Sequence, residues 1–249
     1  MQINTSVVNF RPPDTLGHNY LAGDVLHTLQ QVSGGALTFH LAHIQEMLDL
    51  PDGWPQAWWD TRDQPVRADW HPSTYAAWLQ RSGAWAKLAA GDVHLVVATA
   101  DQRGGFAEFC IRGPGAGIDG NYGKTWGQVL PDLGRTYSIW GFNCQRDLAS
   151  ALHAVGHSVE ERLRQRIPGV YKSWCGNDQM YADFKSSDPV PDAVWRGFAG
   201  VGSVHYPPFS RQCYEYDGPE SEEWGSSHLG YMRRWLSAIP QQWWGLVLS

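Results

Sequence analysis

The chain of 249 residues is long enough for one large domain or two small ones, and its 43% hydrophobic and 18% charged residues exclude a disordered protein. A formal charge of −6 without any Lys/Arg cluster argues against a nucleic-acid partner. No apolar run approaches the roughly 18 residues that a membrane span needs, so we predict none.

The first part of the chain alternates apolar runs with helical patterns. Residues 6–10 are a β-branched run that ends at two prolines, and residues 36–44 alternate as a second strand does. Between them, residues 20–35 repeat apolar side chains at helical intervals and end in Gly-Gly. Residues 53–72 are rich in Pro and Trp and have no period, which predicts a long excursion, and residues 74–91 form another helical pattern.

The middle of the chain contains two further strand patterns. Residues 92–100 are apolar throughout, as in a strand buried on both faces. Residues 104–123 are rich in glycine and predict a loop region. Residues 136–143 form the fourth predicted strand, which leads into a helix over residues 143–163, "NCQRDLASALHAVGHSVEERL".

This order favours an α/β fold with a mainly parallel sheet flanked by helices, because parallel neighbours need crossover connections. We predict a single domain over residues 1–249, with residues 1–167 as its core of sheet and helices. Residues 168–249, rich in Trp, Pro and Gly, predict an irregular C-terminal cap. It ends in a helical pattern over residues 229–244 that is interrupted at Pro240.

Ligands of open α/β sheets bind outside the carboxyl ends of the strands, so polar residues after each strand are candidates for a site. Glu108 follows the third predicted strand, and Asn143 and Arg146 follow the fourth. We predict catalytic roles for Glu108 and Arg146 and substrate binding for Asn143. An ordinary polar loop end is the alternative interpretation for each of them.

The helix over residues 143–163 carries the main candidate site. At 100° per residue, His153, His157 and Glu160 share one side. We expect the opposite side to face the sheet with a stripe formed by Leu148, Leu152, Val155, Val159 and Leu163. Imidazole and carboxylate groups at this spacing are ligands for zinc or another divalent metal.

Three interpretations of this polar face stay open. It is a metal site, a metal-free catalytic or binding site, or an ordinary solvated face on which Glu160 and Arg164 form an ion pair. His205 lies in a stiff segment, "GSVHYPPF", which suits a further ligand or a proton-transfer group. This segment, which contains His205, is framed by a glycine and two prolines.

Known zinc patterns match this region only in part. The spacing of "HAVGH" is that of H-E-x-x-H, but Ala154 stands where that motif has its general-base glutamate. "HSVE" with the later His205 resembles the H-x-x-E…H pattern of zinc carboxypeptidases.

Several segments resemble a group of uncharacterised, mostly exported bacterial proteins, in order over most of the chain. They are "SGGALTFHLAHIQEM", "GGFAEFCIRGPGA", "SIWGFNCQRDLASALHAVGHSVEERL", "GSVHYPPF" and "YMRRWLSAIP". The resemblance implies a single natural domain and favours a secreted protein, although the chain as given has no signal peptide. It implies no activity and no site residues.

The function that we expect is a metal-dependent hydrolase of amide or ester bonds, acting on a small-molecule or peptide substrate. His153, His157 and Glu160 would bind the ion, His205 would be a further ligand or proton-transfer group, and Glu108 would be the general base.

The alternative is a metal-free carbohydrate-active enzyme or a sugar-binding domain with a saccharide ligand. Glu108 would pair with Glu160, Glu215 or Asp217 as the second carboxylate. Tryptophans would be the stacking platforms, namely Trp54, Trp58, Trp59, Trp243 and Trp244. A recognition domain without catalysis stays open as well.

Four widely spaced cysteines form no CxxC pair, which disfavours a zinc finger. They are Cys110, Cys144, Cys175 and Cys213. Two disulfides in an exported protein and four thiols in a cytosolic one fit this spacing equally. Cys144, directly before the helix, is also a weak candidate for a nucleophile.

Overall fold

The structure, a computed structural model, describes residues 1–10, 21–47, 79–100, 108–114, 116–119, 130, 132–143, 146–175, 204 and 227–248. Its strands are β1 Gln2–Phe10, β2 Thr38–Met47, β3 Leu95–Ala100, β4 Phe109–Gly113, β5 Ala116–Asp119 and β6 Tyr137–Asn143. Its helices are α1 Leu21–Val32, α4 Ala84–Ala90, α5 Leu148–Arg166, α6 Pro168–Cys175, α9 His228–Ser237, the 3-10 turn η3 Gln241–Trp243 and α10 Trp244–Leu248. None of the helices within these ranges has the length and apolar character that crossing a membrane requires.

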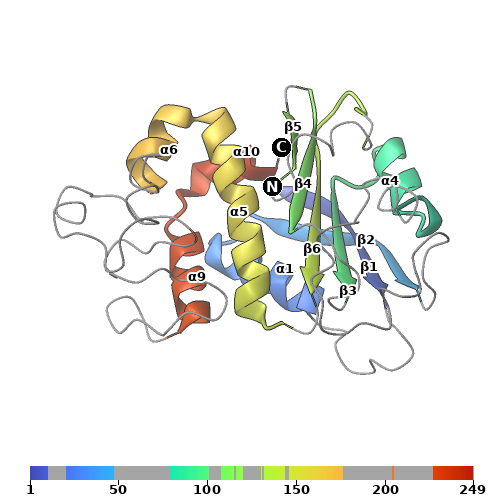
Figure 1. Cartoon of the computed structure of the whole chain (residues 1–249), viewed down its shortest axis with the longest axis horizontal. Helices are drawn as coiled ribbons and strands as arrows, with labels where there is room; N and C mark the ends of the chain where they lie inside the picture. The colour runs from blue at the N-terminus through green and yellow to red at the C-terminus, as the bar shows by residue number, and fades with distance from the viewer. Residues whose placement is uncertain are drawn as a thin grey trace, which may run out of the picture.

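The strands form one sheet in the order β2-β1-β3-β6-β4-β5. The neighbours from β2 through β1 and β3 to β6 are parallel, whereas β4 is antiparallel to both β6 and β5. Helices lie on both faces of this sheet, with α1, α5 and α9 on one side and α4 on the other (Figure 1). The predicted α/β fold with a mainly parallel sheet is therefore confirmed.

The prediction of a loop region over residues 104–123 is wrong for β4 and β5, which form an antiparallel pair. One of the glycines that suggested a loop, Gly113, is the last residue of β4 and is required there. Gly113 has φ +155°, and a Cβ atom there would lie 2.6 Å from Thr136 Cα, so only glycine allows this close approach of two backbones.

Two cores lie on the two faces of the sheet. In β3, Leu95 and Val97 point into the core shared with α1, α5, α9 and α10, while Val96 and Ala98 point into the core that contains Leu88 of α4. Every residue of β3 is buried, which confirms the prediction of a strand covered on both faces.

The helix predicted over residues 74–91 is interrupted in its described part. A helical turn at residues 79–81 ends before α4 begins at Ala84. The hydroxyl of Ser82 donates to the Leu79 carbonyl and accepts from the Ala84 N–H, so it takes over hydrogen bonds that would continue the helix.

Helix α5 lies at the centre of its layer. Asp147 caps its beginning, where the carboxylate accepts a hydrogen bond from the Ser150 N–H at 2.9 Å. Four members of the predicted apolar stripe are buried in the core that they share with the sheet, namely Leu152, Val155, Val159 and Leu163.

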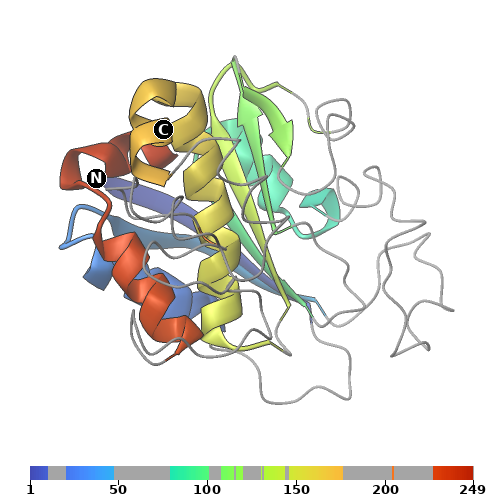
Figure 2. The same ribbon diagram turned by 60° about the vertical axis from the view of Figure 1, so that its left-hand side comes forward.

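The described C-terminal helices pack against α5. Helix α9 runs beside α5 in both views (Figure 1, Figure 2), and α10 also contacts α5. The interruption predicted at Pro240 is confirmed, since α9 ends at Ser237 and η3 begins directly after the proline. Most of the predicted cap, residues 176–203 and 205–226, lies outside the described residues.

Candidate functional site

The polar face of α5 is covered. His153 is 0% exposed, and the side chains of His157 and Glu160 keep 19% and 14% of their surface. The interpretation as an ordinary solvated face is therefore wrong. The ion pair expected between Glu160 and Arg164 is wrong as well, because Arg164 Nη2 lies 2.7 Å from Oε2 of Glu161.

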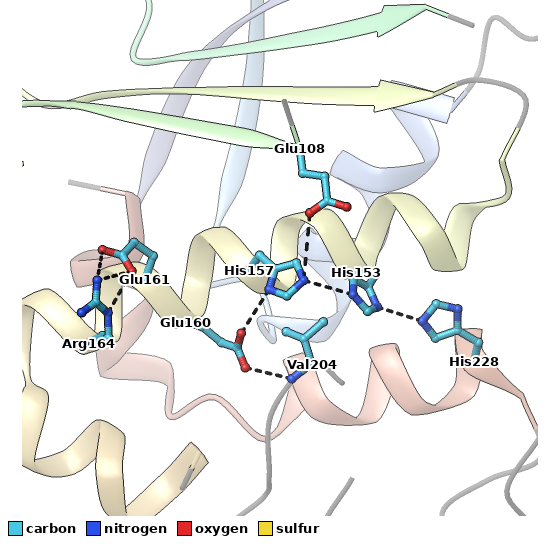
Figure 3. Close-up of polar contacts among 8 residues, drawn as sticks. All are labelled: Glu108, His153, His157, Glu160, Glu161, Arg164, Val204 and His228. Atoms are coloured by element: carbon cyan, nitrogen blue, oxygen red, sulfur yellow. Dashed lines mark hydrogen bonds and ion pairs between the residues drawn. The ribbon is translucent and has the colours of Figure 1, made fainter. Parts of the chain in front are cut away.

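Three segments that are distant in sequence close over this face: Glu108 directly before β4, Val204, and His228 at the start of α9 (Figure 3). The carbonyl of Glu108 accepts a hydrogen bond from the Gly141 N–H of β6, which fixes Glu108 against the sheet. Oε2 of Glu108 lies 4.0 Å from Nε2 of His157. The predicted polar face thus lies on the flank of α5, between the sheet and α9.

Gly156 makes this cover possible. A Cβ atom at Gly156 would lie 2.7 Å from a methyl carbon of Val204 and 3.0 Å from the terminal methyl of Met232 in α9. Both distances are shorter than a methyl contact allows, so the absent side chain lets these two segments approach α5 beside His157.

The two histidines of α5 face each other through the same ring nitrogen. Nε2 of His153 lies 3.1 Å from Nε2 of His157. The ring centroids are 4.8 Å apart and the ring planes are inclined by 72°. Two rings joined head-on across this nitrogen separation would have more distant centroids, so the rings lean away from the straight line through the two Nε2 atoms.

The other nitrogen of each ring has a partner of its own. Nδ1 of His153 lies 3.2 Å from Nε2 of His228, and Nδ1 of His157 lies 3.3 Å from Oε2 of Glu160. The second carboxylate oxygen, Oε1 of Glu160, accepts a hydrogen bond from the Val204 N–H at 2.8 Å. Both imidazoles are therefore held at Nδ1.

Glu160 contacts Nδ1 of His157, whereas Nε2, on the other edge of the same ring, faces His153 (Figure 3). The three ligands predicted from spacing therefore do not face one common point. Among the side chains that the structure describes, no group of three His, Cys, Asp or Glu residues is arranged to hold a metal ion.

The electrostatics of the cluster differ between its two ends. Burial lowers the pKa of His157, but the hydrogen bond to Glu160 and the negative charges of Glu160 and Glu108 outweigh it, so the pKa is raised above its ordinary value. Burial lowers the pKa of His228, against the opposing charge of Asp147. The carboxylate end of the cluster therefore attracts a cation.

Two other predicted site residues lie before helix α5. Asn143 is the last residue of β6, and Arg146 is exposed directly before Asp147, the residue that caps α5. His157, in contrast, lies in the middle of that helix. Trp244 is buried, 2% exposed, so its predicted role as an open stacking platform is wrong, and Trp243 packs partly buried against the same core.

Several predictions fall outside the described residues. They concern His205, Trp54, Trp58, Trp59, Glu215, Asp217, Cys144 and Cys213.

Sequence reasoning missed His228. It lies one residue before the helical pattern predicted over residues 229–244, and no spacing connects it with His153, which is 75 residues away. The available signal was a histidine that follows a serine at a helix start, a pattern too common to indicate a site.

Comparisons with protein-family models, with curated proteins and with solved structures found no match for this chain.

Proposed function

We propose that this protein is a metal-dependent hydrolase of amide or ester bonds, and that Nε2 of His153 and Nε2 of His157 bind the ion. The observation that carries the proposal is the approach of these two nitrogens to 3.1 Å while both rings are held at Nδ1. Zinc or another divalent ion that accepts imidazole ligands suits such a pair.

The separation of the two nitrogens supports an ion. Two nitrogen ligands of a tetrahedral zinc ion, each at about 2.0–2.1 Å from it, lie about 3.3 Å from one another. The observed 3.1 Å is close to this value. The leaning of the rings, whose centroids are 4.8 Å apart, suits two lone pairs directed at a common point better than a linear hydrogen bond.

The surroundings of the two rings also support an ion. A metal-binding histidine usually donates its other N–H to a carboxylate, a carbonyl or water, which fixes the ring and raises its basicity. His157 has this arrangement with Glu160, which Val204 holds in turn. We therefore propose that Glu160 is not a ligand of the ion but holds the ring of His157 through Nδ1.

A third protein ligand is needed for a catalytic zinc site, which usually has three and leaves one position for water. We keep His205 for this role, because it follows Val204 in the sequence and the Val204 N–H is bound to Glu160. A ligand from beyond the described residues also agrees with the lack of a three-residue group among the described ones.

Glu108 is proposed as the general base. Its Oε2 is the carboxylate oxygen near Nε2 of His157, at 4.0 Å, and its side chain keeps 21% of its surface exposed to solvent. A bound divalent ion supplies a water of lowered pKa. The carboxylate of Glu108 would take the proton of that water and return it to the leaving group.

The test is the metal content of the purified protein, measured by elemental analysis before and after treatment with a chelator. We expect one divalent ion per chain, hydrolysis of a model ester or peptide that stops with the chelator, and recovery when zinc is restored. The variants His153→Ala and His157→Ala should both lose the ion.

The control is His27→Ala, which removes an exposed histidine of α1 and should leave the metal content unchanged. If His153→Ala and His157→Ala keep the metal content of the natural protein, the proposed function is wrong.

A further inference from the structure

We infer that His228 is a positioning residue of this site, which holds His153 through Nδ1 and so directs Nε2 of His153 at the ion. The inference rests on the proposed function. It adds to the site a third imidazole, which comes from the C-terminal helix α9 and which no spacing in the sequence identifies.

The tautomers follow from the chemistry of imidazole. A neutral ring that binds an ion through Nε2 carries its proton on Nδ1. Nδ1 of His153 would then be a donor, and Nε2 of His228, 3.2 Å away, would accept the hydrogen bond. His228 would carry its own proton on Nδ1. The two rings lie edge to face, with centroids 5.3 Å apart and planes inclined by 73°.

Burial makes this partner necessary. His153 is 0% exposed, so bulk water does not replace an acceptor that is removed from Nδ1. A buried N–H that loses its partner is unfavourable, and the ring would turn to satisfy it. Turning the ring moves Nε2 away from its position opposite His157.

The packing of α9 fixes the position of His228. The helix begins at His228, and the hydroxyl of the capping residue Ser227 accepts a hydrogen bond from the Gly230 N–H at 3.1 Å. The buried side chains of α9 belong to the same core as α5, namely Tyr231, Met232, Trp235 and Leu236. The helix thus presents the His228 ring to His153 as a rigid element.

Each ligand histidine therefore has its own support from a distant segment. His157 is held by Glu160, which Val204 fixes, and His153 is held by His228 (Figure 3). The C-terminal region would thus determine the direction of both Nε2 atoms.

The experiment titrates the metal-free full chain with Co²⁺ and Zn²⁺ and follows the visible absorption of the bound cobalt. In His228→Leu, which keeps the bulk and removes the acceptor, we expect affinity 10–100-fold weaker and a changed cobalt spectrum. His228→Gln has an amide oxygen that can accept from Nδ1 of His153, and it should restore much of the affinity.

His27→Leu is the matched control, because it makes the same substitution at an exposed histidine of α1, away from the cluster. It should leave the cobalt affinity and spectrum unchanged. Near-ultraviolet circular dichroism shows that each variant is folded.

The two proposals fail in different ways. If the natural protein binds neither Co²⁺ nor Zn²⁺, both are wrong. If it binds zinc and His228→Leu binds with the same affinity and cobalt spectrum, the positioning role is wrong and the proposed function stands. Should the Leu variant not fold, nitrogen-15 NMR of the zinc-loaded natural protein decides, because a proton on Nε2 instead of Nδ1 of His153 overturns the inference.

Discussion

Helices α1 and α5 both carry a histidine with a polar partner four residues later, and the two pairs have opposite environments. In α1, His27 and Gln31 are exposed, with Nε2 atoms 2.8 Å apart. In α5, the Nε2 atoms of His153 and His157 are 3.1 Å apart, and His153 is fully buried. The same spacing therefore gives a surface pair in one helix and a candidate site in the other.

The difference lies in what covers each face. Buried polar groups need hydrogen-bond partners, and imidazoles without water must find them in the protein. In α5 these partners are Glu160 and His228, while α1 leaves its pair to solvent. A pattern of side chains on a helix thus becomes a candidate site only when other segments close over it.

The largest effect that we expect from a change at the covered face of α5 is on the rate of hydrolysis. In Glu108→Gln, we expect hydrolysis to fall by about 10²–10⁴-fold, because the amide cannot accept the proton of the bound water. The metal content should be unchanged if Glu108 is the base. Turnover of a model ester and elemental analysis measure the two quantities.

The control for this change is Glu161→Gln, which removes the ion pair with Arg164 on the same helix. It should leave turnover unchanged. Full turnover in Glu108→Gln would exclude Glu108 as the general base.

The second effect is thermal stabilisation by zinc. Zinc at 100 times its dissociation constant should stabilise the metal-free chain by about 2.7 kcal/mol, because the ion binds the folded state. For a chain of this length that raises the melting temperature by several degrees. His153→Ala should abolish the rise and His27→Ala should keep it; an equal rise in both would contradict the assigned ligands.

The third effect contrasts one glycine in each helix. Gly156→Ala should destabilise the fold by about 1–3 kcal/mol, because its Cβ atom would overlap Val204 and Met232. Gly23→Ala in α1 has nothing within 4 Å of its Cβ atom, so it should stabilise the helix by roughly 0.5–1 kcal/mol. Denaturant unfolding measures the change in the free energy of unfolding of each variant. If both variants change it in the same direction, the close packing at Gly156 is contradicted.

The fourth effect is the pH dependence of zinc affinity. A proton on Nε2 of His157 must leave before an ion binds there, and the pKa of His157 lies above its ordinary value. Affinity should therefore fall as pH decreases through that pKa, by up to about tenfold per pH unit. Zinc titrations at about pH 8 and about pH 6 test this, and equal affinities would mean that no imidazole binds the ion.

The elements that the sequence predicted well are those with strong local periodicity. The apolar run of β3 and the 3.6-residue pattern of α5 required no knowledge of their neighbours. Strands β4 and β5 were missed because both are short, their glycines carry no periodic signal, and the pairing of β4 with β6 is non-local.

The sequence by itself determined that His153, His157 and Glu160 share one side of a helix, because spacing along a helix is fixed by its geometry. Only the tertiary structure decided that this side is buried, that Glu160 turns to Nδ1 of His157, and that His228 joins His153. These contacts depend on how α9, Val204 and the sheet pack around α5, and local propensity carries no information about such packing.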